Sequence, residues 1–194
     1  MLAIIHEMIA LGLYDRDFLR QYTNSPDLVN ADESSDDFGL FLRSDKKVEE
    51  SCIDPDNKIW LDRHQDRAVQ AHSSDADPRL MGEFEMEQGK VKPAFQLLKE
   101  RVEQYTPEWA EGITGISAQT IRRLAHEMGI TARDETVELP IPWTDAWGRE
   151  HESITGNPVS FHAMRGLAAH SNGFQKIRAL GILMTILGTI DRPG

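Results

Sequence analysis

The most regular pattern in the chain lies on its C-terminal side, and it limits the possible fold more than any other feature. From Val159 to Met164, the residues Val, Phe and Ala alternate with Ser, His and Met, which predicts a β-strand. A polar stretch bracketed by glycines, Arg165–Gly173, follows it. Residues Phe174–Leu187 are apolar on most faces, which predicts a buried helix that Gly188 ends. The order of strand, glycine-containing loop and helix predicts an α/β fold with parallel strands and covering helices.

The loop in this pattern is a candidate binding site for an anion. Free backbone N–H groups at a helix N-terminus and the helix dipole both favour a phosphate, and open α/β sheets place ligands at the carboxyl ends of their strands. An arginine can bind a phosphate through two hydrogen bonds, and glycines let the backbone approach a ligand closely. The candidate binding residues are Arg165, Gly166, His170, Ser171, Asn172 and Gly173.

These residues also have a simpler interpretation, in which the loop is a plain turn and Ser171 or Asn172 caps the helix. The residue types alone favour this simpler interpretation and leave both open. The full glycine pattern of dinucleotide-binding folds, GxGxxG, is absent from the sequence, so a nicotinamide site is not indicated.

The chain as a whole divides into three segments. Residues 1–29 form a helical opening segment, residues 30–92 an irregular β-meander, and residues 93–194 the α/β part that contains the candidate loop. In the meander, Ser- and Asp-rich turns such as ADESSDD separate short β-like runs, namely GLFLRS, KIWLDR, AVQAH and GEFEMEQG. This acidic segment is interpreted as a solvated insertion.

Helical periodicity and capping residues predict the remaining elements. Helices are expected at Met1–Gly12, Asp15–Tyr22 with Asp15 as its cap, Pro93–Gln104, from Thr106 onward, and from the cap Ser117 to a stop at Gly129. The stretch LPIPWTDAWG that follows is expected to be a loop.

Composition excludes several classes of protein. The formal net charge of -11 disfavours general binding to nucleic acid. Cys52 is the only cysteine, which excludes an internal disulfide and any multi-cysteine zinc or iron–sulfur site in this chain. The longest apolar stretch, Ala179–Leu187, is too short to span a bilayer.

The motifs HExxH and GxSxG are absent, so neither metal ligands nor catalytic residues are assigned. The N-terminus lacks the basic region of a signal peptide, which predicts a cytoplasmic location, with export of the parent protein as the alternative if a leader lies upstream.

One stretch permits a different function. Gly115–Glu135 has the pattern of a helix-turn-helix unit with Arg122 and Arg123 exposed, and a helix of that type can enter a DNA groove. The acidic net charge and the lack of nearby lysines count against it. A non-catalytic DNA-binding or interaction module is therefore kept as the alternative, beside an inert and partly folded fragment.

Three stretches of the chain, taken in order, resemble one known family. They are YDRDFLRQYTNSPDLV (Tyr14–Val29), FQLLKERVEQYTPEWAEGITGISAQTIRRLAHEMG (Phe95–Gly129) and FHAMRGLAAHSNGFQKIRALGILMTILGTIDRPG (Phe161–Gly194). Together they resemble the large subunits of molybdopterin-dependent oxidoreductases in the dimethyl-sulfoxide-reductase superfamily. The wording of TNSPDLV, GLFLRSD and AMRGLAAHSNG is most similar to the branch with sulfite dehydrogenase and the thiosulfate and polysulfide reductases.

The resemblance implies a fold and a set of cofactors. The chain would be part of a Rossmann-like domain, and the parent subunit would bind molybdenum through molybdopterin guanine dinucleotide and carry an iron–sulfur cluster. The loop Arg165–Gly173 would lie beside the cofactor. Many relatives place a glutamine before the loop histidine, where this chain has Ala169.

The resemblance also implies a function and partners. The chain would be an internal fragment of a catalytic subunit that oxidises a small sulfur oxyanion such as sulfite. Its partners would be the remainder of that subunit, a membrane anchor and an iron–sulfur electron-transfer subunit. The family takes its metal ligand from a region before the one seen here, so the isolated chain is expected to be inactive.

Overall fold

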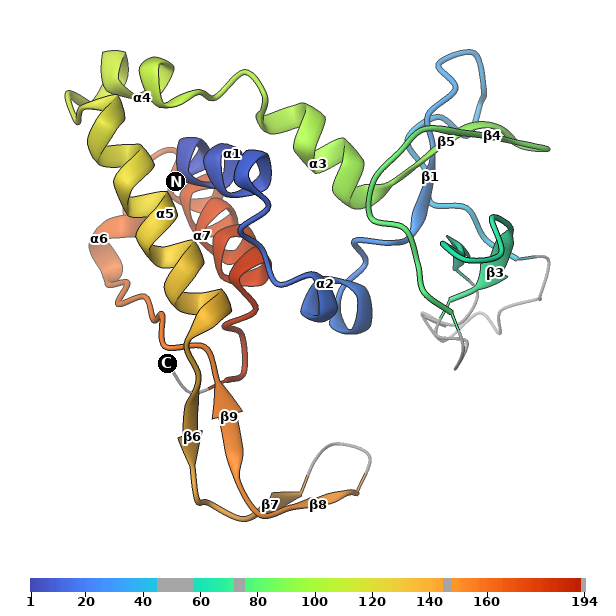
Figure 1. The fold of residues 1–194 in the computed structure, drawn as a ribbon. Coiled ribbons are helices and arrows are strands. Elements are labelled where there is room, and N and C mark those ends of the chain that lie inside the picture. The colour runs from blue at the N-terminus through green and yellow to red at the C-terminus, as the bar shows by residue number, and fades with distance from the viewer. Residues whose placement is uncertain (45–57, 72–75, 145–147, 193–194) are drawn as a thin grey trace. The chain divides into compact units, whose positions relative to one another are not determined.

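The structure is a computed structural model that describes residues 1–44, 58–71, 76–144 and 148–192 (Figure 1). The chain divides into two compact units. Unit 1 comprises residues 1–18 and 102–194, and unit 2 comprises residues 19–101. The described helices include none that is long and apolar enough to cross a membrane.

Unit 1 is built from helices that pack on α1 (Leu2–Leu11), which lies against α4 (Pro107–Thr114), α5 (Ala118–Asp134) and α7 (Gly173–Leu187). The predicted first helix is confirmed, and it ends at Gly12, whose φ of 68° is left-handed. The buried side chains of α1 are Ala3, Ile5, Met8 and Ile9.

The predicted helix starts of unit 1 are confirmed by their caps. The hydroxyl of Thr106 accepts a hydrogen bond from the backbone N–H of Trp109 at 3.2 Å, and that of Ser117 accepts one from Thr120 at 3.2 Å. Asp15 caps α2 (Arg16–Tyr22) in the same way, through the N–H of Phe18 at 2.8 Å.

The predicted end of α5 at Gly129 is wrong, because the helix continues to Asp134. Gly129 is buried, and a Cβ atom placed on it would lie 2.6 Å from the Cβ of Leu13. The glycine therefore lets Leu13, which follows α1, approach α5 closely, and it does not end α5.

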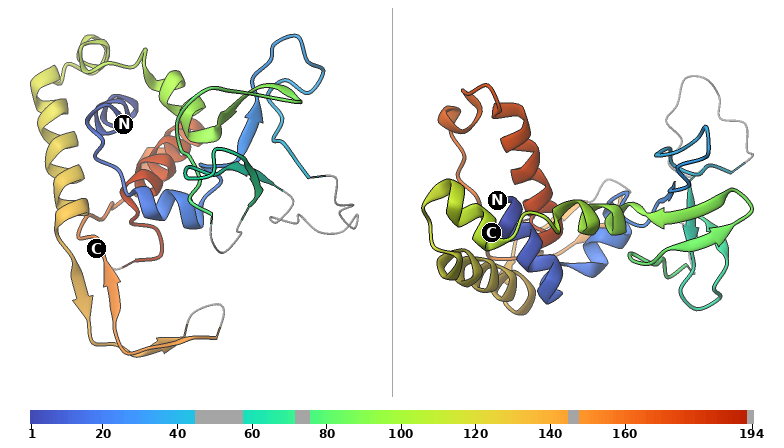
Figure 2. Two further views of the ribbon diagram at one scale, coloured as in Figure 1. Left: turned by 45° about the vertical axis from the view of Figure 1, so that its right-hand side comes forward. Right: turned by 90° about the horizontal axis from the view of Figure 1, so that it is seen from above.

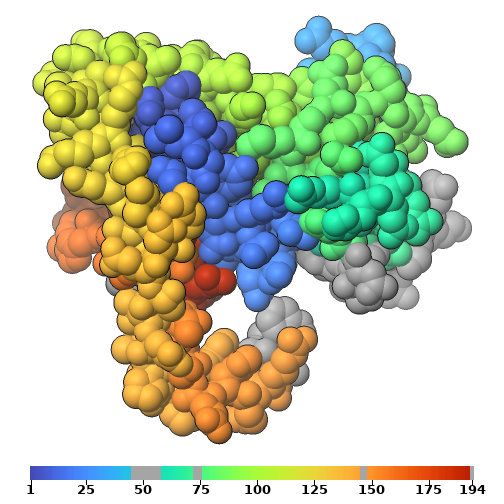
Figure 3. All heavy atoms as spheres, viewed as in Figure 1, coloured from blue at the N-terminus to red at the C-terminus, as the bar shows by residue number. Residues whose placement is uncertain are grey.

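A two-stranded ribbon extends from the helices of unit 1 (Figure 1), and its atoms form the yellow-orange arm at the bottom of the space-filling view (Figure 3). Its first part pairs β6 (Val137–Leu139) with β9 (Ile154–Gly156), and its second pairs β7 (Trp143–Thr144) with β8 (Glu150–His151), both antiparallel. The stretch LPIPWTDAWG, predicted to be a loop, thus contributes β7.

The predicted strand Val159–Met164 is not formed. The N–H of Val159 instead donates to the carbonyl of Asn157 at 2.7 Å in a local turn, and no strand pairs with residues 159–164 in the described ranges. Alternation of side chains predicts a strand only where a neighbour completes the ladder.

Unit 2 contains a three-stranded antiparallel sheet in the order β1 (Leu28–Asn30), β5 (Gly89–Pro93), β4 (Phe84–Met86). A second pair joins β2 (Ile59–Leu61) to β3 (Ala68–Gln70), and α3 (Ala94–Val102) follows β5. Leu28, Leu42, Leu61 and Val91 form a core cluster.

The predicted β-like runs are confirmed for KIWLDR, AVQAH and GEFEMEQG, which contain β2, β3 and β4. In GLFLRS, Phe41 and Arg43 form only isolated bridges. Part of the predicted meander, residues 45–57 and 72–75, lies outside the described residues.

Every strand pairing within the described ranges is antiparallel. The Rossmann-like arrangement with parallel strands therefore stays a prediction.

Candidate functional site

The candidate loop Arg165–Gly173 folds into a helical hairpin. Residues Arg165–Ala168 form the short helix α6, which lies beside α7 (Figure 2). The expectation of an irregular loop is wrong for these four residues, because the N–H of Ala169 donates to the carbonyl of Arg165 at 3.0 Å and closes a helical turn. A tight turn then leads to Gly173, whose N–H donates to the carbonyl of His170 at 2.9 Å.

The two predicted glycines play different parts in this hairpin. A Cβ atom on Gly173 would lie 1.8 Å from the carbonyl oxygen of Ala168, so only glycine permits this close approach of α6 to α7. A Cβ on Gly166 would meet nothing within 4 Å. The backbone at Gly166 is thus open to solvent, whereas Gly173 is buried by its own chain.

The beginning of α7 has no side-chain cap from the residue at its cap position. Asn172 occupies that position, and its amide makes no capping hydrogen bond. The hydroxyl of Ser171 has no hydrogen-bond partner among residues 148–192 or elsewhere in the described chain. The plain capping role that the sequence permitted is therefore not found, and the first N–H groups of α7 have no side-chain acceptor among the residues that the structure describes.

The remaining candidate side chains are exposed. Arg165, His170, Ser171 and Asn172 all lie on the surface of unit 1. No ion pair or hydrogen bond of the Arg165 guanidinium group is found in the part of the chain that the structure describes. The hairpin thus offers hydrogen-bond donors that the described part of the chain leaves unused.

Charge is distributed unevenly along the sequence around this hairpin. The chain carries 32 acidic residues, yet residues 153–190 contain no Asp or Glu. The same stretch carries Arg165, Lys176 and Arg178. A hairpin with three cations and no carboxylate in its sequence, within a chain of net charge -11, is a local environment that favours an anion.

Sequence reasoning missed a cluster that holds the C-terminal end of α7. The amide of Asn157 donates to the carbonyl of Leu187 at 2.8 Å, and the N–H of Asp15 donates to that of Ile186 at 2.8 Å. A guanidinium nitrogen of Arg192 lies 3.5 Å from the Asp15 carboxylate. The only hint of this cluster in the sequence was Gly188, which we had interpreted only as the end of the helix.

This cluster borders a cavity of about 340 Å³ within unit 1. The cavity is lined by Leu13, Tyr14, Asp15, Arg16, Asp17, Gly129, Ala132, Arg133, Asn157 and Leu187. Asp15 and Asn157 are engaged with the backbone ends of helices, and Arg133 pairs with Asp134 at 2.6 Å. Asp15 and Asn157 therefore hold helix ends of unit 1 in place, whereas Arg133 makes a half-exposed ion pair with the next residue in the sequence.

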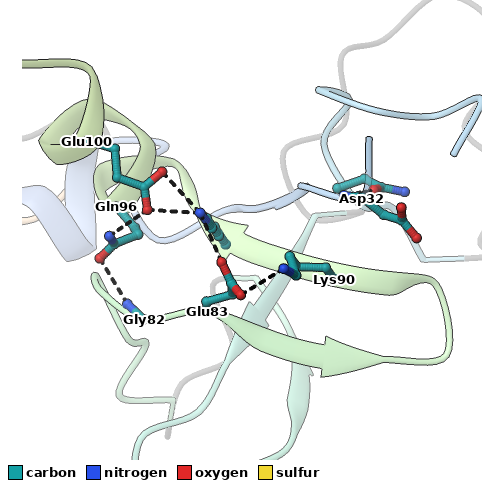
Figure 4. Close-up of polar contacts among 8 residues, drawn as sticks. Asp32, Gly82, Glu83, Lys90, Gln96 and Glu100 are labelled. Atoms are coloured by element: carbon teal, nitrogen blue, oxygen red, sulfur yellow. Dashed lines mark hydrogen bonds and ion pairs between the residues drawn. The ribbon is translucent and has the colours of Figure 1, made fainter. Parts of the chain in front are cut away.

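Unit 2 holds a separate polar network (Figure 4). The ammonium group of Lys92 donates to Glu100 at 2.9 Å and lies 3.0 Å from Glu83, which also pairs with Lys90 at 3.0 Å. Hydrogen bonds from Lys92 and Lys90 hold the pKa of the Glu83 carboxyl below its ordinary value, and hydrogen bonds to Glu100 and Glu83 raise the pKa of Lys92. Gln96 extends the network by donating to Glu100 at 2.8 Å. Each charged group in this network pairs with an opposite charge, so we interpret the network as a structural feature and not as a binding site.

The described residues contain no group of three His, Cys, Asp or Glu side chains that could hold a metal ion. The arginines of the alternative DNA-binding unit pair with carboxylates of their own chain. Arg122 contacts Glu108 at 2.6 Å and Glu7 at 3.4 Å, and Arg123 lies 3.8 Å from Glu127. They behave as a solvated helix face, and no observation supports binding to DNA.

Comparison with known proteins relates the whole chain to redox enzymes. No family model matches the chain. It is 66% identical over its full length to the A-subunit of sulfite dehydrogenase from Allochromatium vinosum, of which it covers 20%. It is also 32% identical over 63% of its length to the alpha subunit of chlorate reductase from Ideonella dechloratans, and 28% identical over 62% to that of dimethylsulfide dehydrogenase from Rhodovulum sulfidophilum, covering 14% of each.

The chain thus spans about one fifth or less of the length of these relatives. The relatives are large subunits of one superfamily, and the similarity to the first of them runs through every element described above. The chain therefore belongs to the molybdopterin-dependent oxidoreductases of the dimethyl-sulfoxide-reductase superfamily.

Proposed function

We propose that this chain is part of the catalytic subunit of a molybdoenzyme that oxidises sulfite. The single observation that carries the proposal is the 66% identity, along the entire chain, to the sulfite dehydrogenase of Allochromatium vinosum. The bound molybdenum cofactor would supply the chemistry, accepting two electrons as sulfite and water give sulfate and two protons. The residues of this chain would bind and orient the cofactor.

The α6–α7 hairpin fits the phosphate part of such a cofactor. A pyrophosphate carries negative charge and accepts hydrogen bonds, and the hairpin presents donors with no carboxylate from residue 153 to residue 190. The guanidinium group of Arg165 and the amide of Asn172 are exposed, and the N-terminus of α7 has no side-chain cap. Charge-assisted hydrogen bonds and the dipole of α7 would hold the phosphate oxygens.

The other candidate residues support the same role. His170 and Ser171 lie in the exposed turn before α7 and can each donate a hydrogen bond. Gly166 leaves the backbone of α6 open to close approach, and Gly173 keeps α6 against α7 so that the donors stay on one hairpin. We propose the guanine dinucleotide form of the cofactor, whose pyrophosphate this donor set would bind.

The remaining parts of the proposal concern the complete enzyme. Each relative is named as one lettered subunit of its enzyme, which indicates assemblies of several subunits. We propose that electrons pass through an iron–sulfur cluster and an iron–sulfur partner subunit to a membrane anchor. We also propose that further strands of the polypeptide complete a Rossmann-like sheet beside unit 1.

The test uses a chimera in which this chain replaces the corresponding segment of the Allochromatium vinosum subunit. Arg165→Ala is compared with Arg123→Ala, whose guanidinium group lies on the exposed face of α5. Loss of charge-assisted hydrogen bonds, worth about 1.5–3 kcal/mol, predicts roughly 10- to 100-fold weaker retention of the cofactor in the first variant only. Molybdenum content by mass spectrometry and sulfite-dependent reduction of an electron acceptor are measured. Full loading and full turnover in Arg165→Ala would refute the role of the hairpin.

A further inference from the structure

Helix α7 is apolar on two opposite sides, and unit 1 covers only one of them. Its buried side consists of Ala179, Leu183, Ile186 and Leu187. On the opposite side Phe174 is 73% exposed and Ile177 is 42% exposed. The prediction of a buried helix is therefore wrong for its first turns, because the described residues supply no cover for this side.

A glycine continues the exposed side toward the middle of the helix. Positions 174, 177 and 181 lie on one helix face, since residues three and seven apart share a face. A Cβ atom on Gly181 would meet nothing within 4 Å. A glycine in a helix interior costs about 1 kcal/mol relative to alanine, and no contact among the described residues requires a glycine here. A backbone that crosses α7 closely at this point would require it.

The positive charge of Arg178 on the same face indicates which side chains a covering segment should carry. The guanidinium group of Arg178 lies 5.7 Å from the centre of the Phe174 ring and 3.3 Å from the side-chain oxygen of Gln175. It has no carboxylate partner in the described ranges, and the sequence around it contains no acid from residue 153 to residue 190. The covering segment should therefore present apolar side chains to Phe174 and Ile177 and a carboxylate to Arg178.

We propose that this face of α7 is an internal interface, covered by another segment of the same polypeptide that crosses at Gly181. The relative that matches along the whole chain is about five times as long, since the chain covers 20% of it. A polypeptide of that length has ample further chain to cover the face. The proposal does not depend on the binding of a cofactor.

The test compares one substitution in two settings, the chain alone and the chimera with the Allochromatium vinosum subunit. In the chain alone, Gly181→Leu gains helix propensity in open space and should raise Tm by about 2–4 °C. In the chimera, the same side chain would clash with the crossing segment and should lower Tm. Gly112→Leu serves as the matched control, because Gly112 is also helical and a Cβ on it meets nothing within 4 Å.

A rise or no change in Tm for Gly181→Leu in both settings would overturn the proposal. A second measurement applies even if a variant folds poorly. In the chimera, Ile177→Cys should react with a maleimide at least 10-fold more slowly before unfolding in urea than after it, and equal rates would count against the interface. If the chain alone sediments as a dimer and Phe174→Ser makes it a monomer, the face joins two copies and the proposal fails.

Discussion

At the scale of single residues, Gly129 shows how packing changes the meaning of a glycine. The sequence treats it as a helix end, whereas the structure places it inside α5 against Leu13. Gly112 is also helical, but the space above it is open. The two glycines therefore offer a matched pair in which one substitution should act in opposite directions.

Gly129→Ala should destabilise the chain, because its new Cβ would lie 2.6 Å from the Cβ of Leu13. Overpacking costs about 1–3 kcal/mol. Because the clash is with the Cβ of Leu13, which the backbone holds in place, the cost should exceed the gain of about 1 kcal/mol in helix propensity. Gly112→Ala should stabilise by about 1 kcal/mol, since propensity alone acts there. Urea denaturation followed by circular dichroism measures both. Stabilisation by both substitutions would contradict the close contact with Leu13.

The carboxylate of Asp62 links the stability of unit 2 to pH. It is buried and accepts hydrogen bonds from the backbone N–H groups of Gln65 at 2.7 Å, Asp77 at 2.9 Å and His64 at 2.9 Å. These bonds hold the pKa of Asp62 below its ordinary value of 3.8. A carboxyl whose pKa is lower in the folded state stabilises the fold above its unfolded pKa, and that contribution is lost as the pH falls through the folded pKa.

The urea midpoint of unit 2 should therefore hold between pH 7 and pH 5 and fall below about pH 4. Asp62→Asn should lower the midpoint at pH 7 and flatten its decline in acid, because the neutral amide cannot serve all three donors as an anion does. Asp36→Asn is the control, since Asp36 is exposed in the acidic loop. Midpoints measured from pH 3 to pH 7 that decline equally in both variants would argue against Asp62 as the titrating group.

At the scale of elements, the features that could be predicted from sequence are the ones with local causes. The caps Thr106, Ser117 and Asp15 each bond to a backbone N–H a few residues away, so residue type and position suffice to place them. Ser117→Ala should cost about 1 kcal/mol, whereas Ser117→Asp should keep most of the stability. Thermal unfolding compares the two, and equal melting temperatures would show that the cap contributes nothing.

The elements that the sequence missed depend on partners far along the chain. The ribbon pairs Leu139 with Ile154, and Trp143 stacks on His151 with 4.7 Å between ring centres. Neither contact leaves a periodic signal within one strand. The predicted strand Val159–Met164 failed for the converse reason, because its alternation is correct but no described strand lies beside it.

The candidate site shows the same division between local and distant causes. The position of α7 and of the glycine-containing segment before it could be predicted from neighbouring residues. The structure keeps all six candidate residues on one hairpin. The short helix α6 and the close contact of Gly173 with Ala168 could not be predicted, because both arise from how two helices meet. The ligand that we propose for the hairpin depends on exposed side chains and on charge, which neither periodicity nor capping encodes.

At the scale of the whole molecule, the content of the chain limits what it can do alone. Its single cysteine cannot assemble an iron–sulfur cluster, and the described residues contain no cluster of metal-binding side chains. The donors of the α6–α7 hairpin are exposed, so a cofactor bound there would meet water on its open side. An enzyme that excludes water from its metal must close that side with other parts of the polypeptide.

The purified chain should therefore retain no molybdenum and show no sulfite-dependent electron transfer, whereas the chimera with the Allochromatium vinosum subunit should show both. The physical reason is that exposed hydrogen bonds to phosphate compete with water and salt, and they hold a ligand firmly only when the site is enclosed. Metal analysis after gel filtration, together with turnover assays, measures the contrast, and cooperative melting of the purified chain serves as the control for folding. Stoichiometric molybdenum in the folded chain alone would show that the hairpin and its surroundings bind the cofactor without the rest of the subunit.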